Sequence, residues 1–200
     1  VTDQTPEPER PPGFYDSFRD LPLRLISLDR PMHAAAQNIA ARQAKGEVLL
    51  SLDDDVDFGP DLLRAHLDVM CAENVDAVFG AITSDAPLPE HLDRDPGVLD
   101  PVSFFLKSPG CRWHGMTLVT SGANTSIKRK WFDRVGGYDE FIPRMADIEF
   151  GYRLFRAGAK ILFSDKPVVN HRRAPLGGTR AVFDDLNYTR LQARLYLHRK

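Results

Sequence analysis

Three consecutive aspartates, Asp53 to Asp55, follow a short apolar run and are the residues of this sequence best suited to chemistry. Adjacent carboxylates repel one another, so the arrangement is costly unless a cation or a polar ligand lies beside it. Side chains alternate along an extended chain, so Asp53 and Asp55 project to one side and Asp54 to the other. Carboxylate oxygens suit hard divalent cations such as Mg²⁺ and Mn²⁺, which often bridge them to phosphates. The sequence therefore predicts a divalent-metal or phosphate site at Asp53 and Asp55.

Neighbouring acids and two other kinds of site offer alternative explanations. Asp57 and Asp61 lie close to the start of a predicted helix, where capping of the positive helix end explains them better. A calcium-binding loop would need Gly at position 58 and Glu at position 64, which hold Phe58 and Arg64. A phosphatase that forms an aspartyl phosphate also uses carboxylates at a strand end. The lysine and threonine that would support it do not follow in order, so it stays a minor alternative.

Predicted strands and helices alternate around the aspartates. We expect strands at 23–28, 47–52 and 76–82, and helices at 32–45 and from Pro60 through Met70. Residues 47–52 are almost continuously apolar, which is typical of a strand buried on both faces, as in a parallel sheet. The alternation predicts an α/β fold with right-handed crossovers. Because ligands of open α/β sheets bind beyond the carboxyl ends of strands, the aspartates lie where a site is expected.

The rest of the chain is less regular. Proline-rich residues 1–20 predict a loop or an extended lead-in, and residues 83–115 predict a long irregular excursion. The further expected elements are an apolar and β-branched segment at 118–129, a helix at 131–135, an amphipathic helix at 146–157, strands at 160–164 and 168–171, and a helix at 181–200. Gly136-Gly137 and Gly158 follow the two inner helices and predict their ends.

Composition narrows the function classes. The 200 residues include 26 Lys and Arg against 28 Asp and Glu, a net charge of −2, so we expect no nucleic-acid partner. Apolar residues make up 42% and charged residues 27%, an ordinary balance for a globular chain. No apolar run approaches the roughly 20 residues that span a bilayer, and no signal peptide is visible. Two cysteines cannot form a disulfide framework, which favours the reducing cytoplasm.

Two segments of the chain carry an ordered set of motifs. They read AAAQNIAARQAKGEVLLSLDDDVDFGPDLL and VTSGANTSIKRKWFDRVGGYDEFIPRMADIEFGYRLFRAGAKILFSDKPVVNH. In order they contain a helix with Asn, a strand ending in Asp-x-Asp, a Gly-Ala-Asn strand, a Val-Gly-Gly-Tyr-Asp-Glu turn, a helix with Asp and Arg, and a late His. Over roughly residues 23–173 this set resembles the family 2 glycosyltransferases of GT-A fold. The resemblance implies a Rossmann-like α/β fold in which helices flank a mixed sheet.

The same resemblance implies an inverting transfer of a sugar from a nucleotide-sugar to an acceptor hydroxyl. Asp53 and Asp55 match the Asp-x-Asp that holds a divalent metal, Mn²⁺ or Mg²⁺, on the diphosphate. Asp147 matches the aspartate that acts as general base on the acceptor. Physically, a metal offsets charge on the leaving diphosphate, and inversion needs one carboxylate on the opposite face to accept the proton.

Further residues are expected near the ligands. The expected donor or acceptor contacts are Asn38, Asp54, Asn124, Trp113 and Glu149, and His171 is expected to join the metal ligands. Each has a structural alternative. Asp147 could cap its own helix, and Asn124 could be a turn residue. His171 could be a hydrogen-bonding histidine of the fold, and Trp113 could serve packing.

The chain also departs from the family pattern. Gln37-Asn38 and Ala146-Asp147 stand where the family usually has Arg-Asn and Glu-Asp, so one cation and one acid are missing. The family begins with a strand, helix and strand that bind the nucleoside, whereas this chain opens at a loop-like VTDQTPEPERPPG. We therefore expect an N-terminally truncated GT-A domain. Two alternatives are a catalytically silent GT-A-like binding domain and a nucleotidyltransferase on a similar sheet.

The C-terminal residues are basic, whereas the chain as a whole has a slight excess of acidic residues. We divide the chain into a GT-A domain at 1–175 and a basic helix at 176–200. Such a helix could lie on an anionic membrane surface, or it could pack its leucines on the domain. The expected location is the cytoplasm, with the inner face of the membrane as an alternative. Expected partners are a nucleotide-sugar donor and a carbohydrate, lipid-linked or other hydroxyl acceptor.

Overall fold

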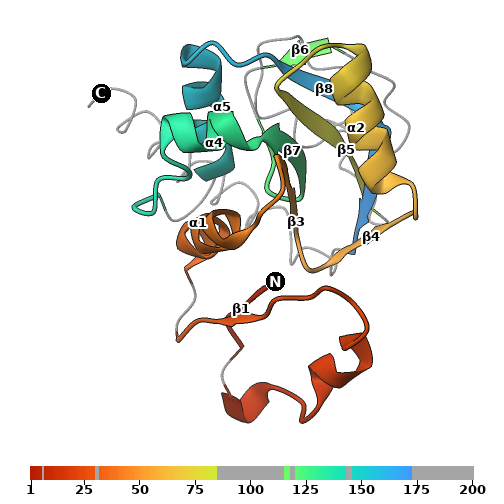
Figure 1. Cartoon of the computed structure of the whole chain (residues 1–200), viewed down its shortest axis with the longest axis vertical. Coiled ribbons are helices and arrows are strands. Elements are labelled where there is room, and N and C mark those ends of the chain that lie inside the picture. The colour runs from red at the N-terminus through yellow and green to blue at the C-terminus, as the bar shows by residue number, and fades with distance from the viewer. Residues whose placement is uncertain (6, 30–31, 85–114, 118–119, 143–145, 173–200) are drawn as a thin grey trace, which may run out of the picture.

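A mixed sheet forms the centre of the molecule (Figure 1). The computed structural model describes residues 1–5, 7–29, 32–84, 115–117, 120–142 and 146–172. The six strands are β3 (Val48–Leu52), β4 (Val56–Phe58), β5 (Ala77–Ser84), β6 (Gly115–Thr117), β7 (Asn124–Lys128) and β8 (Ile161–His171). Their order is β3-β7-β5-β8-β4, with β6 also paired to β8. Among the described pairs of this sheet, β5–β8 is parallel and the others are antiparallel.

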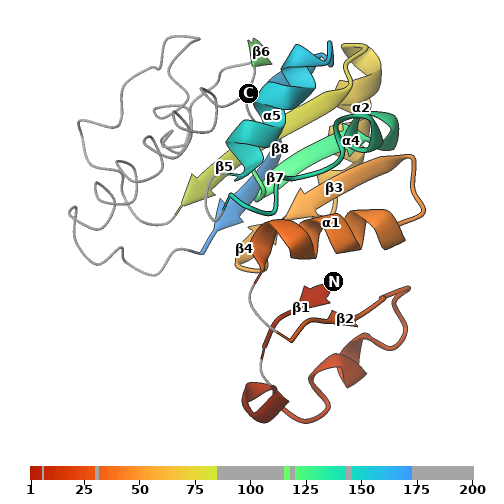
Figure 2. The same cartoon turned by 90° about the vertical axis from the view of Figure 1, so that its left-hand side faces the viewer.

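Helices cover both faces of this sheet, as Figure 2 shows. The helices are α1 (His33–Gln43), α2 (Leu62–Ala72), α4 (Arg129–Val135) and α5 (Ala146–Arg156). Because side chains alternate along a strand, Ala77, Ile127 and Ile161 pack toward α1, α4 and α5, whereas Val78 and Leu162 pack toward α2. The predicted α/β architecture, with helices on both faces of a mixed sheet, is confirmed.

The helices begin and end close to the predicted positions. Alanine-rich α1 and amphipathic α5 fall within the expected ranges, and α2 begins at Leu62, two residues after Pro60. Gly136 ends α4 with a φ of 82°, a left-handed conformation that glycine adopts without a steric penalty. The N–H of Gly137 then donates to the carbonyl of Phe132, which closes the helix end.

Three expectations about strands are corrected. The prediction that 47–52 forms a strand buried on both faces of a parallel sheet is wrong, because β3 is half-buried and pairs antiparallel with β7 at one end of the strand order. The two strands expected at 160–164 and 168–171 form one strand, β8, whose register to β5 shifts between Gly80 and Ala81. The short strand β4 was not expected from the sequence, and it pairs with the end of β8.

The N-terminal segment forms a small unit next to α1 (Figures 1 and 2). Its two-residue strands β1 (Thr2–Asp3) and β2 (Ile26–Ser27) pair in parallel, and short 3₁₀ helices η1 (Glu7–Glu9) and η2 (Phe14–Phe18) lie between them. The strand expected at 23–28 is therefore much shorter. The side chain of Gln4 accepts a hydrogen bond from the backbone N–H of Met32, which ties this unit to the start of α1.

Two expected features fall outside the described residues. They are the central part of the irregular excursion at 83–115, with Trp113 in it, and the basic helix at 176–200. Within the part of the chain that the structure describes, no helix has both the length and the apolar character needed to cross a bilayer.

Candidate active site

The ends of β3 and β8 bring Asp53, Asp55 and His171 together. Nε2 of His171 lies 3.6 Å from Oδ2 of Asp53 and 3.3 Å from Oδ1 of Asp55. One potential ligand atom from each residue lies within 4.8 Å of the others. We call these residues the acidic cluster. The structure thus places close together three side chains that the sequence analysis assigned to one metal.

Strand pairing holds the acidic cluster in place. The chain turns after β3 into β4, and Val56 of β4 pairs with His171. The backbone N–H of Arg172 donates to the carbonyl of Asp55 at 2.8 Å, and its guanidinium pairs with Asp57. The loop that carries the aspartates is therefore anchored to the carboxyl end of β8.

The electrostatics of the acidic cluster suit a cation. Burial raises the pKa of Asp53, the nearby His171 and His33 lower it, and the charges of Asp55 and Asp54 raise it again. Two carboxylates and an imidazole are a donor set that Mn²⁺ and similar divalent ions accept. The residues therefore fit a divalent cation, which would offset the repulsion between the carboxylates. Asp54 is exposed and lies outside this group, as the alternation along the chain predicts.

Asp147 lies in the first turn of α5 and is half-buried. Its Oδ2 accepts the backbone N–H of Gly122 at 3.1 Å, and its Oδ1 accepts that of Ile148 at 3.0 Å. Burial raises the pKa of Asp147, although these two N–H groups and the nearby His33 act in the opposite direction. A carboxylate held by backbone donors and with a raised pKa can both cap a helix and accept a proton.

Tyr138 lies beside the candidate site and is not among the residues predicted from the sequence. Its ring stacks on Phe150, with 4.3 Å between ring centroids. Burial raises the pKa of Tyr138, the charge of Asp147 adds to this rise, and a hydrogen bond with Ser51 opposes it. The phenol therefore lies close to both Asp147 and the end of β3. The Gly-Gly-Tyr turn was the available signal, but the turn alone does not tell which way the ring points.

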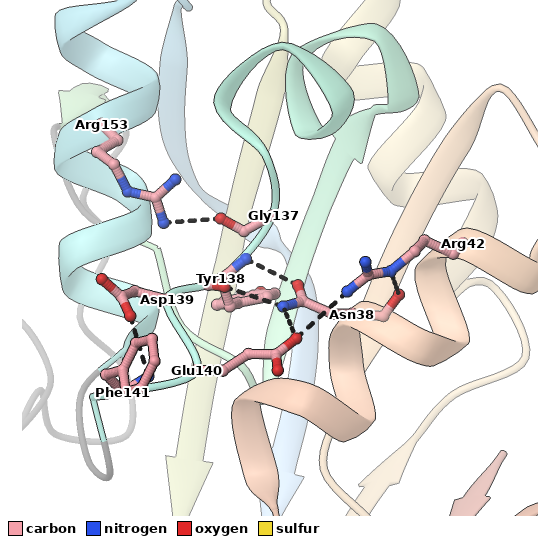
Figure 3. A network of polar contacts seen from close by, with 8 residues as sticks. All are labelled: Asn38, Arg42, Gly137, Tyr138, Asp139, Glu140, Phe141 and Arg153. Atoms are coloured by element: carbon pink, nitrogen blue, oxygen red, sulfur yellow. Dashed lines mark hydrogen bonds and ion pairs between the residues drawn. The ribbon is translucent and has the colours of Figure 1, made fainter.

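Asn38 fixes the turn that carries Tyr138 (Figure 3). Its side-chain oxygen accepts the N–H of Tyr138 at 2.8 Å, and its amide nitrogen donates to the carbonyl of Tyr138 and to the carboxylate of Glu140, each at 2.9 Å. Asn38 is buried, and its amide is used by the protein itself. In this structure Asn38 positions the Tyr138 turn, and its expected contact with donor or acceptor stays a prediction.

Arg153 holds the same turn from α5 (Figure 3). Its guanidinium donates to the carbonyls of Val135 and Gly137, each at 2.7 Å, and to Oε1 of Glu149 at 2.6 Å. Glu149 is buried beneath this arginine. Oε1 of Glu149 serves the ion pair that orients Arg153, whereas its buried Oε2 has no hydrogen-bond partner among the described residues. The expected ligand contact of Glu149 stays a prediction.

Asn124 is a core residue and not a surface contact. Its Nδ2 donates to the carbonyls of Ala81 and Pro167, at 2.9 and 3.1 Å, where the register of β8 shifts against β5. Its Oδ1 lies 2.8 Å from Nε2 of His66. The fully buried side chain of Asn124 thus bridges the irregular strand pair, and its expected contact with a ligand stays a prediction.

Comparisons with known proteins identify the family. The family model described as Glycosyl transferase family 2 matches residues 6–136. The O-antigen biosynthesis protein RfbC of Myxococcus xanthus is 27% identical over 169 residues, which cover 76% of this chain and 13% of that protein. The uncharacterized glycosyltransferase YwdF of Bacillus subtilis (strain 168) is 27% identical over 180 residues, 84% of this chain and 64% of that protein. The chain thus spans under two thirds of the length of either relative.

Solved structures share the fold. GalNAc-T7, crystallised with UDP, GalNAc and Mn²⁺, gives a TM-score of 0.60 at 19% identity, over 81% of this chain and 35% of that one. The mannosyltransferase PcManGT of Pyrobaculum calidifontis, in complex with GDP-Man and Mn²⁺, gives 0.59 at 18% identity, over 81% and 43%. Together with the family match over more than half of the sequence, the fold leads to one conclusion. The chain belongs to glycosyl transferase family 2 and has the GT-A fold.

Proposed function

We propose that this chain carries the catalytic site of a metal-dependent, inverting glycosyltransferase. One observation carries the proposal: the acidic cluster and the half-buried carboxylate of Asp147 come from different elements but lie on either side of Gly122. The N–H of Gly122 donates to Asp147, and a Cβ on Gly122 would lie 3.7 Å from Oδ1 of Asp53. The donor would be a nucleotide-sugar, and the acceptor a carbohydrate, a lipid-linked molecule or another hydroxyl compound. Fold relatives crystallised with Mn²⁺ and UDP or GDP-Man support this choice of ligands.

In this proposal Asp53, Asp55 and His171 would hold the divalent cation. When bound, the cation supplies Lewis-acid stabilisation of the negative charge that builds up on the leaving diphosphate. The carboxylate positions of the acidic cluster are set by the β3–β4 turn and the end of β8, so they exist before the ligand arrives. A site organised in advance loses less energy to rearrangement during the reaction.

Asp147 acts as the general base. The acceptor oxygen attacks the anomeric carbon, the bond from that carbon to the diphosphate oxygen breaks, and the hydroxyl proton moves to the Asp147 carboxylate. The N–H groups of Gly122 and Ile148 hold this carboxylate in one orientation. Burial raises the pKa of Asp147, which makes its carboxylate a stronger base than that of an exposed aspartate. A single displacement of this kind inverts the anomeric configuration.

The expected location of this activity is the cytoplasm or the inner face of the membrane. Nucleotide-sugars are polar, and the sparse use of cysteine suits a reducing compartment. A peripheral contact through the basic residues after position 175 remains part of the proposal. It is tested by cosedimentation with anionic vesicles, before and after removal of residues 176–200.

The main test is a pair of substitutions in the full protein. Asp147→Asn should lower transfer from a nucleotide-sugar about a thousandfold or more while Mn²⁺-dependent donor binding is kept. Asp55→Ala should instead weaken Mn²⁺-dependent nucleotide binding. Asp68→Asn, an exposed aspartate on α2, is the matched control and should change neither. An active Asp147→Asn enzyme, or an Asp55→Ala variant with unchanged Mn²⁺ dependence, would refute the assigned roles.

A catalytically silent GT-A-like binding domain is the second candidate. The observation that favours it is that Gln37 and Ala146 stand where the family usually has an arginine and a glutamate, so one cation and one acid of the usual site are replaced. A silent domain would bind Mn²⁺ and nucleotide but show no transfer or hydrolysis with any nucleotide-sugar in the full protein. The same assays therefore separate the two candidates.

A further inference from the structure

Polar side chains converge above Gly122, next to the two acids that the proposed mechanism uses. A Cβ atom placed on Gly122 would lie 3.0 Å from Nε2 of Gln37 and 3.7 Å from both Oδ1 of Asp53 and Nε2 of His33. His33 and Gln37 lie one turn apart on α1, so both reach the same point. We call His33, Gln37 and Gly122 the α1 subsite.

The α1 subsite lies between the two halves of the proposed chemistry. Asp53, at one side, belongs to the acidic cluster that would hold the donor diphosphate through a cation. Asp147, at the other side, accepts the N–H of Gly122. The nearby His33 also lowers the pKa of both carboxylates, which agrees with a position between them. The sugar links the diphosphate to the attacking hydroxyl, so its ring must pass through this space.

The chemistry of the subsite suits sugar hydroxyls. Each hydroxyl can donate and accept a hydrogen bond. Gln37 donates weakly to Ser51, at 3.4 Å, while its Oε1 is buried and has no hydrogen-bond partner among the described residues. A buried acceptor without a donor is costly, and a ligand hydroxyl would satisfy it. His33 is exposed and can present its ring nitrogens to a ligand. Because Gly122 has no side chain, Gln37 and His33 can lie this close to its backbone, and a methyl group there would press against Nε2 of Gln37.

We propose that His33 and Gln37 bind hydroxyl groups of the transferred hexose above Gly122, and so contribute to donor-sugar specificity. This inference rests on the proposed function and extends it to residues that neither bind the cation nor accept the proton. The subsite distinguishes a nucleotide-sugar from its nucleoside diphosphate, because the diphosphate has no hexose to fill it.

The test measures, by calorimetry with Mn²⁺, how tightly the full protein binds a nucleotide-sugar and how tightly it binds the matching nucleoside diphosphate. UDP, UDP-glucose, UDP-N-acetylglucosamine, GDP and GDP-mannose serve as probes. His33→Ala should weaken binding of the preferred nucleotide-sugar about tenfold and leave binding of its nucleoside diphosphate unchanged. Gly122→Ala should show the same selectivity, because its methyl group occupies the subsite. His33→Asn, which keeps a hydrogen-bonding group, should recover part of the affinity. Arg64→Ala removes an exposed cation from α2 and is the matched control.

Each other outcome overturns the inference in a recognisable way. Equal losses for nucleotide-sugar and diphosphate would assign His33 to the phosphate or cation. Unchanged binding of both the nucleotide-sugar and the diphosphate would show that His33 contacts neither ligand. Failure of the unsubstituted protein to bind any probe would reject the proposed function and the subsite together, whereas the first two results reject the subsite alone. Because His33 is exposed, its replacement should leave the melting temperature within about 2 °C, which checks that each variant is folded.

Discussion

Asp147 must be ionised to accept a proton, and its surroundings oppose ionisation. Burial raises the pKa of this carboxyl above its ordinary value of 3.8, and the N–H groups of Gly122 and Ile148 compensate only in part. The base is thus stronger than an exposed aspartate but loses its charge at a higher pH. This trade-off should be visible in the pH dependence of the reaction.

We predict that kcat at saturating Mn²⁺ and donor falls as the pH is lowered through the raised pKa of Asp147. The acidic limb should therefore lie above pH 3.8, the ordinary pKa of an aspartate. The measurement is kcat between pH 4 and pH 8, with donor binding followed separately by calorimetry to exclude loss of the cation. An acidic limb at or below the ordinary value, with donor binding intact, would contradict the role of Asp147.

Single residues were predicted unevenly, and the reason is physical. Asp53, Asp55 and His171 were assigned together, and they do lie together, because strand ends at one edge of a sheet must meet. Asn38, Asn124 and Glu149 carry polar groups that could serve a ligand or the protein. Their residue types do not reveal that their hydrogen bonds end on the Tyr138 turn, the β8 irregularity and Arg153. His33 has no local pattern, and the Gly-Gly-Tyr turn does not reveal where the Tyr138 ring points, since only tertiary packing brings both to the site.

At the scale of elements, the helices were easier to predict than the strands. α1, α2 and α5 have local signals such as alanine content, apolar spacing and following glycines, and these signals do not depend on distant residues. β3 was mistaken for an inner parallel strand, because its apolar run does not specify its neighbours. β4 has only three residues, and it exists because the end of β8 is available for pairing.

The β5–β8 irregularity gives a sharp test at this scale. A side chain at Gly80 would place its Cβ against Nδ2 of Asn124 and 2.5 Å from the carbonyl oxygen of Pro167. We predict that Gly80→Ala lowers the free energy of unfolding by about 1–3 kcal/mol, as overpacking of a filled core does. Urea unfolding at neutral pH measures the change.

Gly59→Ala is the matched control for this substitution. A Cβ at Gly59 meets no atom within 4 Å, so the same chemical change should alter stability by less than about 0.5 kcal/mol. A Gly80→Ala protein as stable as the control would show that Asn124 and Pro167 can move apart, and that the buried amide does not hold the register of β8.

At the scale of the whole molecule, the order of the motifs was enough to predict the layered α/β fold. The family resemblance implied a mixed sheet, and the sheet and family match agree with it. The buried hydrogen bonds that join helix α2 to the sheet could not be predicted from the sequence. His66 projects from α2 into the sheet and links Asn124 and Ser126, two alternate residues of β7 that face α2.

The buried link through His66 makes the stability of the whole fold depend on pH. Nδ2 of Asn124 is committed to two carbonyls, so its Oδ1 must accept from Nε2–H of His66, and Nδ1 then accepts from the Ser126 hydroxyl. This pattern requires a neutral imidazole. Burial lowers the pKa of His66 from its ordinary value of 6.5, and the Asn124 hydrogen bond opposes this only in part.

We predict that His66 makes the protein less stable as the pH falls below 6.5. In that range the unfolded chain takes up a proton at His66 and the folded chain does not, so stability present above pH 6.5 is lost toward the lowered pKa. The measurement is the free energy of unfolding in urea at pH 5 to pH 8. His66→Leu should be less stable overall, because it leaves Asn124 and Ser126 without a partner, but its stability should fall less steeply with acid. If the slope of His66→Leu equals that of the unsubstituted protein, protonation at this position does not limit the acid stability of the two layers.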